Sequence, residues 1–301
     1  MLKGIRHTAV LVLGGALLAL ALASCSGTPG PAVPDRAPGS GERIPSEILL
    51  ITSSGTGKVL GYDLGGNYLG EFATPPPGDE WLVGITFGVD GDLYLSSYGQ
   101  SAILRFDADD YLASQGMRFV GPFAQGGGLT APEAITFKDG YLYVASSGTD
   151  AILKYDGITG EFIKTFASTF SPWSLAFGPD GNLYVDSADN NIYRFDGETG
   201  KALGVFASHE MLSRPAGIVF DEEGDLYVGS QDNNLVLRFN GITGEFLGTT
   251  QGGPLDMPWQ LAFGPDGNLY VASAGNNKIL VYDGNTLSFI RTFADGGPLS
   301  H

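Results

Sequence analysis

Cysteine and histidine are almost absent from this chain of 301 residues. Its only cysteine is Cys25, so no disulfide can form within the chain. Of the three histidines, His7 lies in the predicted export signal and His301 is terminal, and the remaining His209 cannot form a three-histidine zinc site alone. His209 beside Glu210 can be interpreted as a catalytic base with its partner, but a solvated loop pair is the preferred interpretation. No serine-hydrolase, phosphate-loop or dinucleotide motif stands in a strand–helix context either, so no catalytic residue is predicted.

Basic residues are scarce as well. The chain has 16 Lys and Arg against 33 Asp and Glu, a formal net charge of −17. A strongly acidic surface repels phosphate backbones, so nucleic acid is not expected as a partner. The same repulsion opposes adsorption on anionic lipid, so any membrane attachment should come from acyl chains.

Long apolar runs are missing except at the N-terminus, where residues 8–21 follow two basic residues. This run is shorter than the roughly 20 residues that span a bilayer, so residues 1–24 are predicted to be an export signal. The signal ends in Leu-Ala-Ser-Cys, which resembles a bacterial lipobox and implies that Cys25 is diacylated. The alternative is an ordinary signal peptide followed by a cysteine without a role.

Residues 25–45 are rich in Pro, Gly and Ser and have no apolar periodicity. They are predicted to form an extended, lipid-anchored tether. We therefore expect an exported protein, attached to a bacterial membrane through acylated Cys25 and facing the periplasm or the cell exterior. Ser26 follows the cysteine where Asp would signal retention, so in a diderm bacterium the lipobox resemblance implies the outer membrane.

From residue 46 onward the sequence repeats. A Leu-Tyr pair recurs with spacings of 49, 41, 43 and 43 residues, at Tyr94, Tyr143, Tyr184, Tyr227 and Tyr270. Each unit contains four short apolar runs separated by Asp-Gly turns, which are typical of β-hairpins. Residues 46–301 are therefore predicted to be an all-β propeller of four-stranded antiparallel meanders. A β-sandwich with coincidental spacing is the weaker alternative.

The string FGPDGNLYV occurs twice, at Phe177–Val185 and Phe263–Val271, within the longer frames PWSLAFGPDGNLYVDSADNN and PWQLAFGPDGNLYVASAGNN. These frames resemble the NHL repeat. They are also similar to the wider six-bladed group that includes TolB-like, gluconolactonase-like and virginiamycin B lyase-like proteins. The resemblance covers about residues 46–300 and implies six blades, but the fold carries little information about activity. The His-and-Glu pair expected of the lyase relatives is not found.

One strand is missing from the count. Five units have a recognisable first strand, whereas the unit that opens at Glu47 has none. The first blade is therefore expected to lack one strand. Either the sequence is truncated at its C-terminus, where a completing strand would begin, or this blade has three strands.

In a propeller the first strands line the central channel, so the positions around their starts are candidates for binding. The residue after the expected Pro varies from unit to unit, and so does the next one: Val83, Glu133, Trp173, Ala216 and Trp259, then Gly84, Ala134, Ser174, Gly217 and Gln260. Glu133, Trp173, Ser174, Trp259 and Gln260 are the candidate residues of a binding site at the channel mouth for a sugar or a peptide. The alternative is that both tryptophans pack between blades.

A metal site is a weaker candidate. The gluconolactonase-like resemblance implies a divalent cation held in the channel, and the candidate ligands are Glu133 and Asp186. The loops 189–191 and 232–234 offer oxygens for surface Ca²⁺, although solvated turn residues are the preferred interpretation. No other cofactor is expected.

Three functions stay open at this point. The first is a membrane-tethered binding module, most simply a monomer, for a protein, peptide or sugar ligand. The second is a metal-dependent hydrolase or lyase of the gluconolactonase-like class. The third is a mechanical spacer without a ligand. The sequence favours the first, because no catalytic set is complete.

Overall fold

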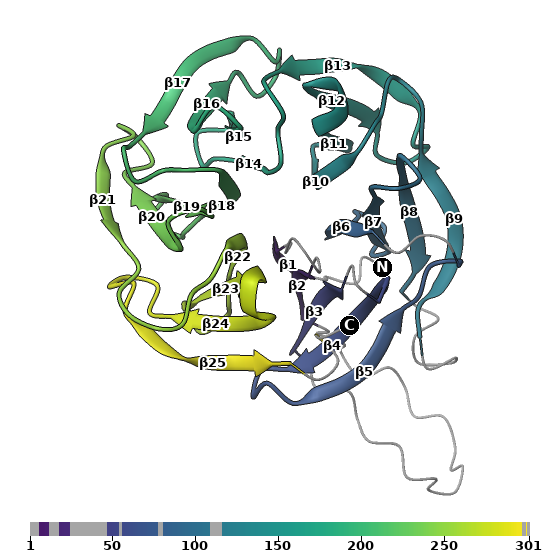
Figure 1. Ribbon diagram of the computed structural model, residues 1–301. Coiled ribbons are helices and arrows are strands. Elements are labelled where there is room, and N and C mark those ends of the chain that lie inside the picture. Colours follow the sequence, from purple (N-terminus) through teal and green to yellow (C-terminus); the bar gives the residue numbers. More distant parts are fainter. Residues whose placement is uncertain are drawn as a thin grey trace, which may run out of the picture.

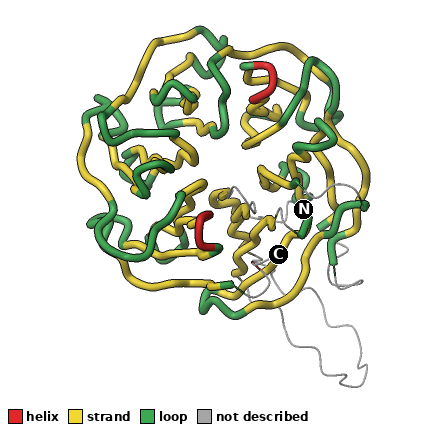
Figure 2. Tube along the Cα trace, in the orientation of Figure 1, coloured by secondary structure: helices red, strands yellow, loops and turns green. Residues whose placement is uncertain are grey.

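The computed structural model is an all-β propeller whose six blades surround a central axis (Figure 1). It describes residues 6–11, 18–24, 47–53, 56–77, 81–108, 116–296 and Leu299. Two helices are described at both ends, the single turns η1 (Ser147–Thr149) and η2 (Ala274–Asn276), as Figure 2 shows. None of the helices in the described part of the chain is long and apolar enough to cross a membrane. The predicted fold class is confirmed.

Blades two to six are four-stranded antiparallel meanders in chain order from the axis outward. The second blade contains β6 (Leu82–Phe87), β7 (Leu93–Ser97), β8 (Ala102–Asp107) and β9 (Arg118–Ala124). The third contains β10 (Pro132–Lys138), β11 (Tyr141–Ser146), β12 (Ala151–Asp156) and β13 (Phe162–Ser168). The fourth contains β14 (Leu175–Phe177), β15 (Leu183–Ser187), β16 (Asn191–Phe195) and β17 (Ala202–Ser208). The fifth contains β18 (Pro215–Phe220), β19 (Leu226–Ser230), β20 (Leu235–Phe239) and β21 (Phe246–Thr249). The sixth contains β22 (Pro258–Phe263), β23 (Leu269–Ser273), β24 (Lys278–Tyr282) and β25 (Phe289–Asp295).

The first blade differs at its inner edge. The repeat region gives it three strands, β3 (Glu47–Ser53), β4 (Lys58–Asp63) and β5 (Tyr68–Ala73), as predicted. Next to β3 the sheet continues with β2 (Leu18–Ser24) and then β1 (Arg6–Leu11), both antiparallel. These two strands belong to the segment predicted to be an export signal, and β1 lies against β6 and β22. Export and cleavage of residues 1–24 stay a prediction.

The tyrosine of each Leu-Tyr pair joins two neighbouring blades. Tyr184 is fully buried and makes edge-to-face contacts with Phe206 of its own outer strand, at 4.7 Å between ring centres, and with Phe220 of the next inner strand, at 4.9 Å. Phe177 of the duplicated string contacts Tyr143 of the preceding blade in the same way, at 4.9 Å. Such pairs contribute roughly 0.5–1.5 kcal/mol beyond their buried area. The duplicated string therefore encodes a joint between blades.

The Asp-Gly turns are coupled to these joints. Gly181 and Gly267 have φ angles of 81° and 74°, a region that glycine enters without a Cβ clash. Asp180 accepts hydrogen bonds from the Asn182 N–H and the Tyr184 hydroxyl, each at 3.0 Å. One carboxylate thus closes the hairpin and orients the tyrosine that fills the joint.

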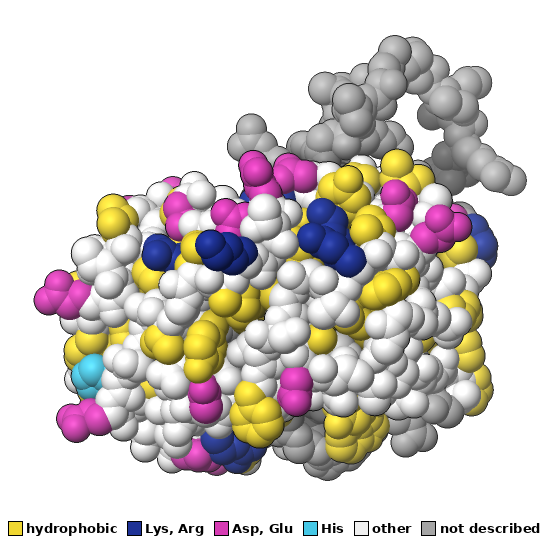
Figure 3. Space-filling model, turned by 90° about the horizontal axis from the view of Figure 1, so that it is seen from above, with side chains coloured by type: hydrophobic (Ala, Val, Ile, Leu, Met, Phe, Trp, Pro, Cys, Tyr) yellow, Lys and Arg dark blue, Asp and Glu magenta, His cyan; other side chains and the backbone are white. Residues whose placement is uncertain are grey.

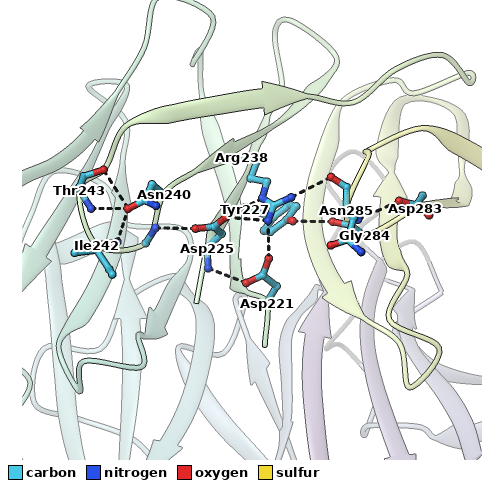
Figure 4. Close-up of polar contacts among 11 residues, drawn as sticks. Asp221, Asp225, Tyr227, Arg238, Asn240, Ile242, Thr243, Asp283, Gly284 and Asn285 are labelled. Atoms are coloured by element: carbon cyan, nitrogen blue, oxygen red, sulfur yellow. Dashed lines mark hydrogen bonds and ion pairs between the residues drawn. The ribbon is translucent and has the colours of Figure 1, made fainter. Parts of the chain in front are cut away.

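A polar clamp reinforces the joint between the fifth and sixth blades (Figure 4). Arg238 donates to Asp225 Oδ2 at 3.0 Å and to the Asn285 carbonyl of the next blade at 3.0 Å. The Tyr227 hydroxyl donates to the Gly284 carbonyl at 2.7 Å. The Arg238 guanidinium also lies 5.3 Å from the Tyr227 ring centre. Charge, hydrogen bonds and an aromatic face act together here to hold two blades in register.

The ring closes between the sixth and first blades. Leu49, Ile51 and Tyr62 of the first blade are buried in one apolar cluster with residues of the sixth. The Tyr62 and Phe293 ring centres are 6.3 Å apart, and Arg291 Nη2 donates to the Leu64 carbonyl at 3.1 Å. Residues 227 positions apart are thereby in direct contact, which closes the circle.

The joint predicts how substitutions at Tyr184 affect stability. Tyr184→Ala removes a buried ring between two phenylalanines and should destabilise the fold by about 3–5 kcal/mol. Tyr184→Phe keeps the ring, loses the bond to Asp180, and should cost only about 1 kcal/mol. Urea unfolding followed by circular dichroism measures both. Equal losses in the two variants would show that the hydroxyl, and not the ring, holds the joint.

Candidate functional site

The inner strands of blades two to six begin, and their second strands end, at the same end of the propeller, which we call the mouth face. Each second strand is followed there by a residue whose N–H donates to the linker that enters the same blade; examples are Tyr98 to Trp81, Ala188 to Phe170 and Gln231 to Arg214. The turns between first and second strands, including Asp-Gly, and between third and fourth strands lie at the opposite end, the turn face. Chain segments from every blade therefore meet at the mouth face.

The Asn-rich loops of the mouth face have a structural task. Asn190 and Asn234 adopt positive φ, and their side-chain oxygens each accept a backbone N–H from the next blade's linker, from Arg214 and Met257, at 2.8 Å. Asn233 donates to the Met211 carbonyl at 2.7 Å. Asn190 and Asn234 therefore connect neighbouring blades, and Asn233 holds the linker that enters its own blade. Ca²⁺ binding by the same loops stays a prediction, and these oxygens are already used by backbone donors.

The varied ring of positions at the starts of the inner strands is connected from blade to blade. Inner strands such as β6, β10 and β18 change register there by a bulge, which leaves backbone groups without a partner in their own sheet. Different residues satisfy these groups: the Ala134 N–H donates to the Trp173 carbonyl at 3.1 Å, and the Ile218 N–H donates to Ser174 Oγ at 3.0 Å. The residues at these positions therefore vary partly because each blade satisfies the free backbone groups at its bulge in a different way.

Two carboxyl groups are buried within this ring. Glu133 is 5% exposed and accepts one bond, from Ser147 Oγ at 3.3 Å. Asp186 is 1% exposed, and its Oδ1 accepts the N–H groups of Trp173 and Ser174 at 2.8 and 2.7 Å. Burial raises the pKa of Asp186 to about 8. Burial, with the nearby charge of Asp186, likewise raises the pKa of Glu133 to about 8. The two predicted metal candidates are thus brought together as an electrostatically coupled acid pair.

Buried polar atoms without a protein partner lie at the same level. Asp186 Oδ2 has none, and neither side-chain atom of Gln231 has one. Gln231 is fully buried and follows β19 at the position that Ser147 occupies after β11. Gln260 is also buried, at 3% exposure. Sequence reasoning found Glu133, Asp186 and Gln260 but missed Gln231, whose only signal was a polar residue where two other blades have alanine.

Trp173 and Trp259 stack on each other across the fifth blade. Their ring centres are 5.3 Å apart and their planes are 13° from parallel. The intervening blade carries Ala216 and Gly217 at the ring positions, and a Cβ on Gly217 would lie 2.6 Å from the Trp259 carbonyl oxygen. Arg214 also lies over the Trp173 ring, at 5.6 Å. Each indole thus uses one face for the other, which reduces the surface left for stacking a sugar.

Other aromatic residues at the mouth face are exposed. Trp81 and Tyr98 are 54% and 36% exposed and contact each other with ring centres 5.6 Å apart. Phe170, in the linker to the fourth blade, is 61% exposed. The side of the propeller between its two faces carries scattered hydrophobic side chains, and charged side chains lie mainly along its upper and lower edges (Figure 3). Sequence reasoning missed all three residues, because their exposure depends on how the linkers fold.

The donor set does not match a divalent metal well. No group of three or more His, Cys, Asp or Glu residues comes together in the described residues. Hard cations such as Ca²⁺ take six to eight oxygen ligands, and the acid pair offers two carboxyl groups. His209 stacks on Phe246, with ring centres 4.1 Å apart, and its Nδ1 accepts the Met211 N–H. The proposed His209–Glu210 base is therefore a packed loop residue beside an exposed one.

Cys25 and the tether at residues 26–45 lie outside the described residues, as does the C-terminal His301. Lipidation of Cys25, membrane attachment and the completeness of the C-terminus stay predictions. The described residues begin again at Glu47, where β3 starts at the turn face.

The buried acid pair predicts an unusual dependence of stability on pH. Glu133 is protonated in both states below its ordinary pKa of 4.5, but between pH 4.5 and about 8 only the folded state keeps its proton. Stability should therefore fall as pH rises across this window. Glu133→Gln cannot ionise and should be more stable than the parent by roughly 1–3 kcal/mol at pH 8, with no gain at pH 4. Urea unfolding at the two pH values tests this. An equal effect at both would mean that Glu133 titrates normally.

Comparison with known proteins supports the fold alone. No family model and no curated protein matches the sequence. Among solved structures, a chain in a nidogen/laminin complex is 19% identical, with a TM-score of 0.70, covering 82% of this chain and 93% of the other. A streptogramin B lyase is 18% identical, with a TM-score of 0.63 and coverages of 84% and 81%. Virginiamycin B lyase from Staphylococcus aureus is 19% identical, with a TM-score of 0.57 and coverages of 78% and 76%. This chain therefore shares its propeller fold with a component of a protein complex and with lyases.

Proposed function

We propose that this protein is a binding module, tethered outside the cytoplasm through acylated Cys25, that docks a protein or peptide ligand on its mouth face. The observation that carries the proposal is the set of exposed aromatic residues there, Trp81, Tyr98 and Phe170, on the same face as exposed Arg214. Trp, Tyr and Arg dominate the energetics of protein interfaces, because they combine large contact area with hydrogen-bond donors. A protein ligand fits this surface better than a sugar, since the two half-buried indoles stack on each other.

The nidogen/laminin neighbour supports a protein ligand by analogy of fold only. The point at which the predicted tether would join the propeller supports the proposal. It joins the chain where β3 begins, at the turn face, so the mouth face is at the end of the propeller away from the attachment point. A ligand on the mouth face would therefore not compete with the anchor for space.

A selection experiment tests the binding function. Peptides from a random phage-displayed library, selected on the immobilised full chain, should bind at the mouth face. The combined variant Trp81→Ala, Phe170→Ala should lose at least tenfold in affinity for them, because it removes two aromatic contacts of about 1 kcal/mol or more each. Surface plasmon resonance measures the affinity, and melting temperature checks the fold.

Ile242→Ala is the matched control, because Ile242 is 86% exposed but lies in a hairpin of the turn face. It should bind selected peptides like the parent. Full affinity in the Trp81/Phe170 variant, together with loss in the Ile242 variant, would place binding at the wrong end of the molecule and refute the proposal.

A metal-dependent hydrolase or lyase of the gluconolactonase-like class is the second candidate. Its support is the acid pair, since a carboxyl with a pKa near 8 can serve as a general acid, and the lyases among the structural neighbours. The binding proposal expects less than stoichiometric Ca²⁺, Mg²⁺ and Zn²⁺ after dialysis, and no hydrolysis of glucono-lactone. Stoichiometric metal and lactone hydrolysis, both lost in Glu133→Gln and both kept in Asp189→Asn at the exposed loop, would establish the enzyme instead.

A further inference from the structure

The acid pair of the mouth has no counter-charge. Among the residues whose side chains the structure describes, no Lys or Arg forms an ion pair with Glu133 or Asp186. Within the described side chains, the one that donates to Glu133 is the Ser147 hydroxyl, at a long 3.3 Å. A buried carboxylate without a cation is costly, because the low-dielectric interior disfavours its charge. The cluster therefore has unused capacity to accept a cation.

The acceptors are distributed over three consecutive blades. Glu133 belongs to the third, Asp186 to the fourth and Gln231 to the fifth. Glu133 and Gln231 lie at the same height along the propeller axis. Glu133 contacts Ser147, and Ser147 and Gln231 occupy equivalent positions, because the N–H of each donates to the linker that enters its blade. Asp186 Oδ2 and Gln231 Oε1 are buried without a protein partner. A ligand group with several N–H donors would supply the partners that these buried oxygens lack.

We propose that this cluster receives an arginine side chain of the peptide ligand, with its guanidinium between Glu133 and Asp186. A guanidinium presents five N–H donors in a plane and pairs with carboxylates through two hydrogen bonds at once. The half-buried indoles of Trp173 and Trp259 belong to the same ring of positions and offer aromatic edges and faces beside which a guanidinium packs well. The net charge of −17 would draw a basic ligand toward the protein. The inference rests on the proposed function and specifies its ligand.

A metal ion is the less suitable occupant. Two carboxyl groups and a glutamine amide fall short of the oxygen shell that a hard divalent cation requires. They suit a guanidinium, which needs only a few acceptors. Binding of Ca²⁺ and of a guanidinium probe to the same protein distinguishes the two occupants.

Binding of a cation should release protons. The titratable group that faces Glu133 is Asp186, and the groups that face Asp186 are the N–H donors of Trp173 and Ser174. Burial keeps both acids largely protonated at neutral pH, and a guanidinium favours their ionised forms. Affinity should therefore increase with pH below the pKa values, by up to about tenfold per pH unit for each proton released.

The test uses ethylguanidinium as the probe and ethylurea as its neutral isostere. Ligand-observed NMR with the full chain should detect ethylguanidinium at pH 8.5, at least tenfold weaker binding at pH 6.5, and no binding of ethylurea. Glu133→Gln should weaken the probe at least tenfold. Asp189→Asn removes the same formal charge from an exposed position of the same mouth loops and should bind like the parent.

Several results would overturn the inference. These are no binding of ethylguanidinium to folded protein at pH 8.5, equal binding of ethylurea, or unchanged affinity in Glu133→Gln. Binding of Ca²⁺ that depends on Glu133, without binding of the guanidinium, would assign the acids to a metal. A melting curve for each variant shows that the fold is intact.

A second measurement separates this inference from the binding function itself. Peptides selected on the mouth face should contain an arginine, and its replacement by citrulline, the neutral isostere, should lower affinity at least tenfold. Some peptides could bind the Trp81/Phe170 variant more weakly than the parent but bind equally well with citrulline in place of arginine. That result would support the binding function and refute the proposed arginine site. If no peptide can be selected but ethylguanidinium still binds through Glu133, the guanidinium site would stand and the peptide-binding function would be refuted.

Discussion

The architecture depends on one aromatic contact, the insertion of a buried tyrosine between two phenylalanines, which Tyr94, Tyr143 and Tyr184 make at three joints of the propeller. Tyr184 illustrates it, with Phe206 from its own blade on one side and Phe220 from the next blade on the other. The contact sets the spacing of neighbouring blades, and its repetition around the axis sets the ring. In the first blade the corresponding residue is Leu50, which packs with Phe72 and Phe87. The apolar contact between blades is kept there, although leucine has no hydroxyl group.

Because the joints and the Asp-Gly turns carry the stability, the mouth face is free to vary. Its linkers and loops are held by repeated backbone bonds and by the amides of Asn190 and Asn234. On this frame the inner ring can hold groups that do not stabilise the fold. Glu133 and Asp186 are such groups, since burying an acid costs free energy that an apolar residue would not. Local features that oppose stability are often found at functional sites, which is why the acid pair is central to the proposed ligand.

The two proposals assign the ends of the propeller to different tasks. The chain enters the repeat region at the turn face, where the predicted tether would attach. The exposed aromatics and the buried acids are at the other end, so a peptide can place apolar side chains on Trp81 and Phe170 while a basic one enters the ring. Specificity would come from the acid pair, because an uncharged side chain there leaves buried oxygens without donors.

The sequence by itself determined the fold class, the number of blades and the missing strand of the first one. Its markers, the Leu-Tyr pairs and Asp-Gly turns, act over a few residues and are repeated, so local rules suffice to recognise them. It also pointed to Glu133, Asp186, Trp173 and Trp259, because these break the repeat. Only the tertiary structure decided that the two indoles stack, that Asp186 binds the backbone of Trp173 and Ser174, and that Gln231 and Phe170 belong to the same face. The indoles come from different blades, and Asp186 meets Trp173 and Ser174 from a neighbouring strand, so the sequence contains no local signal for these distances.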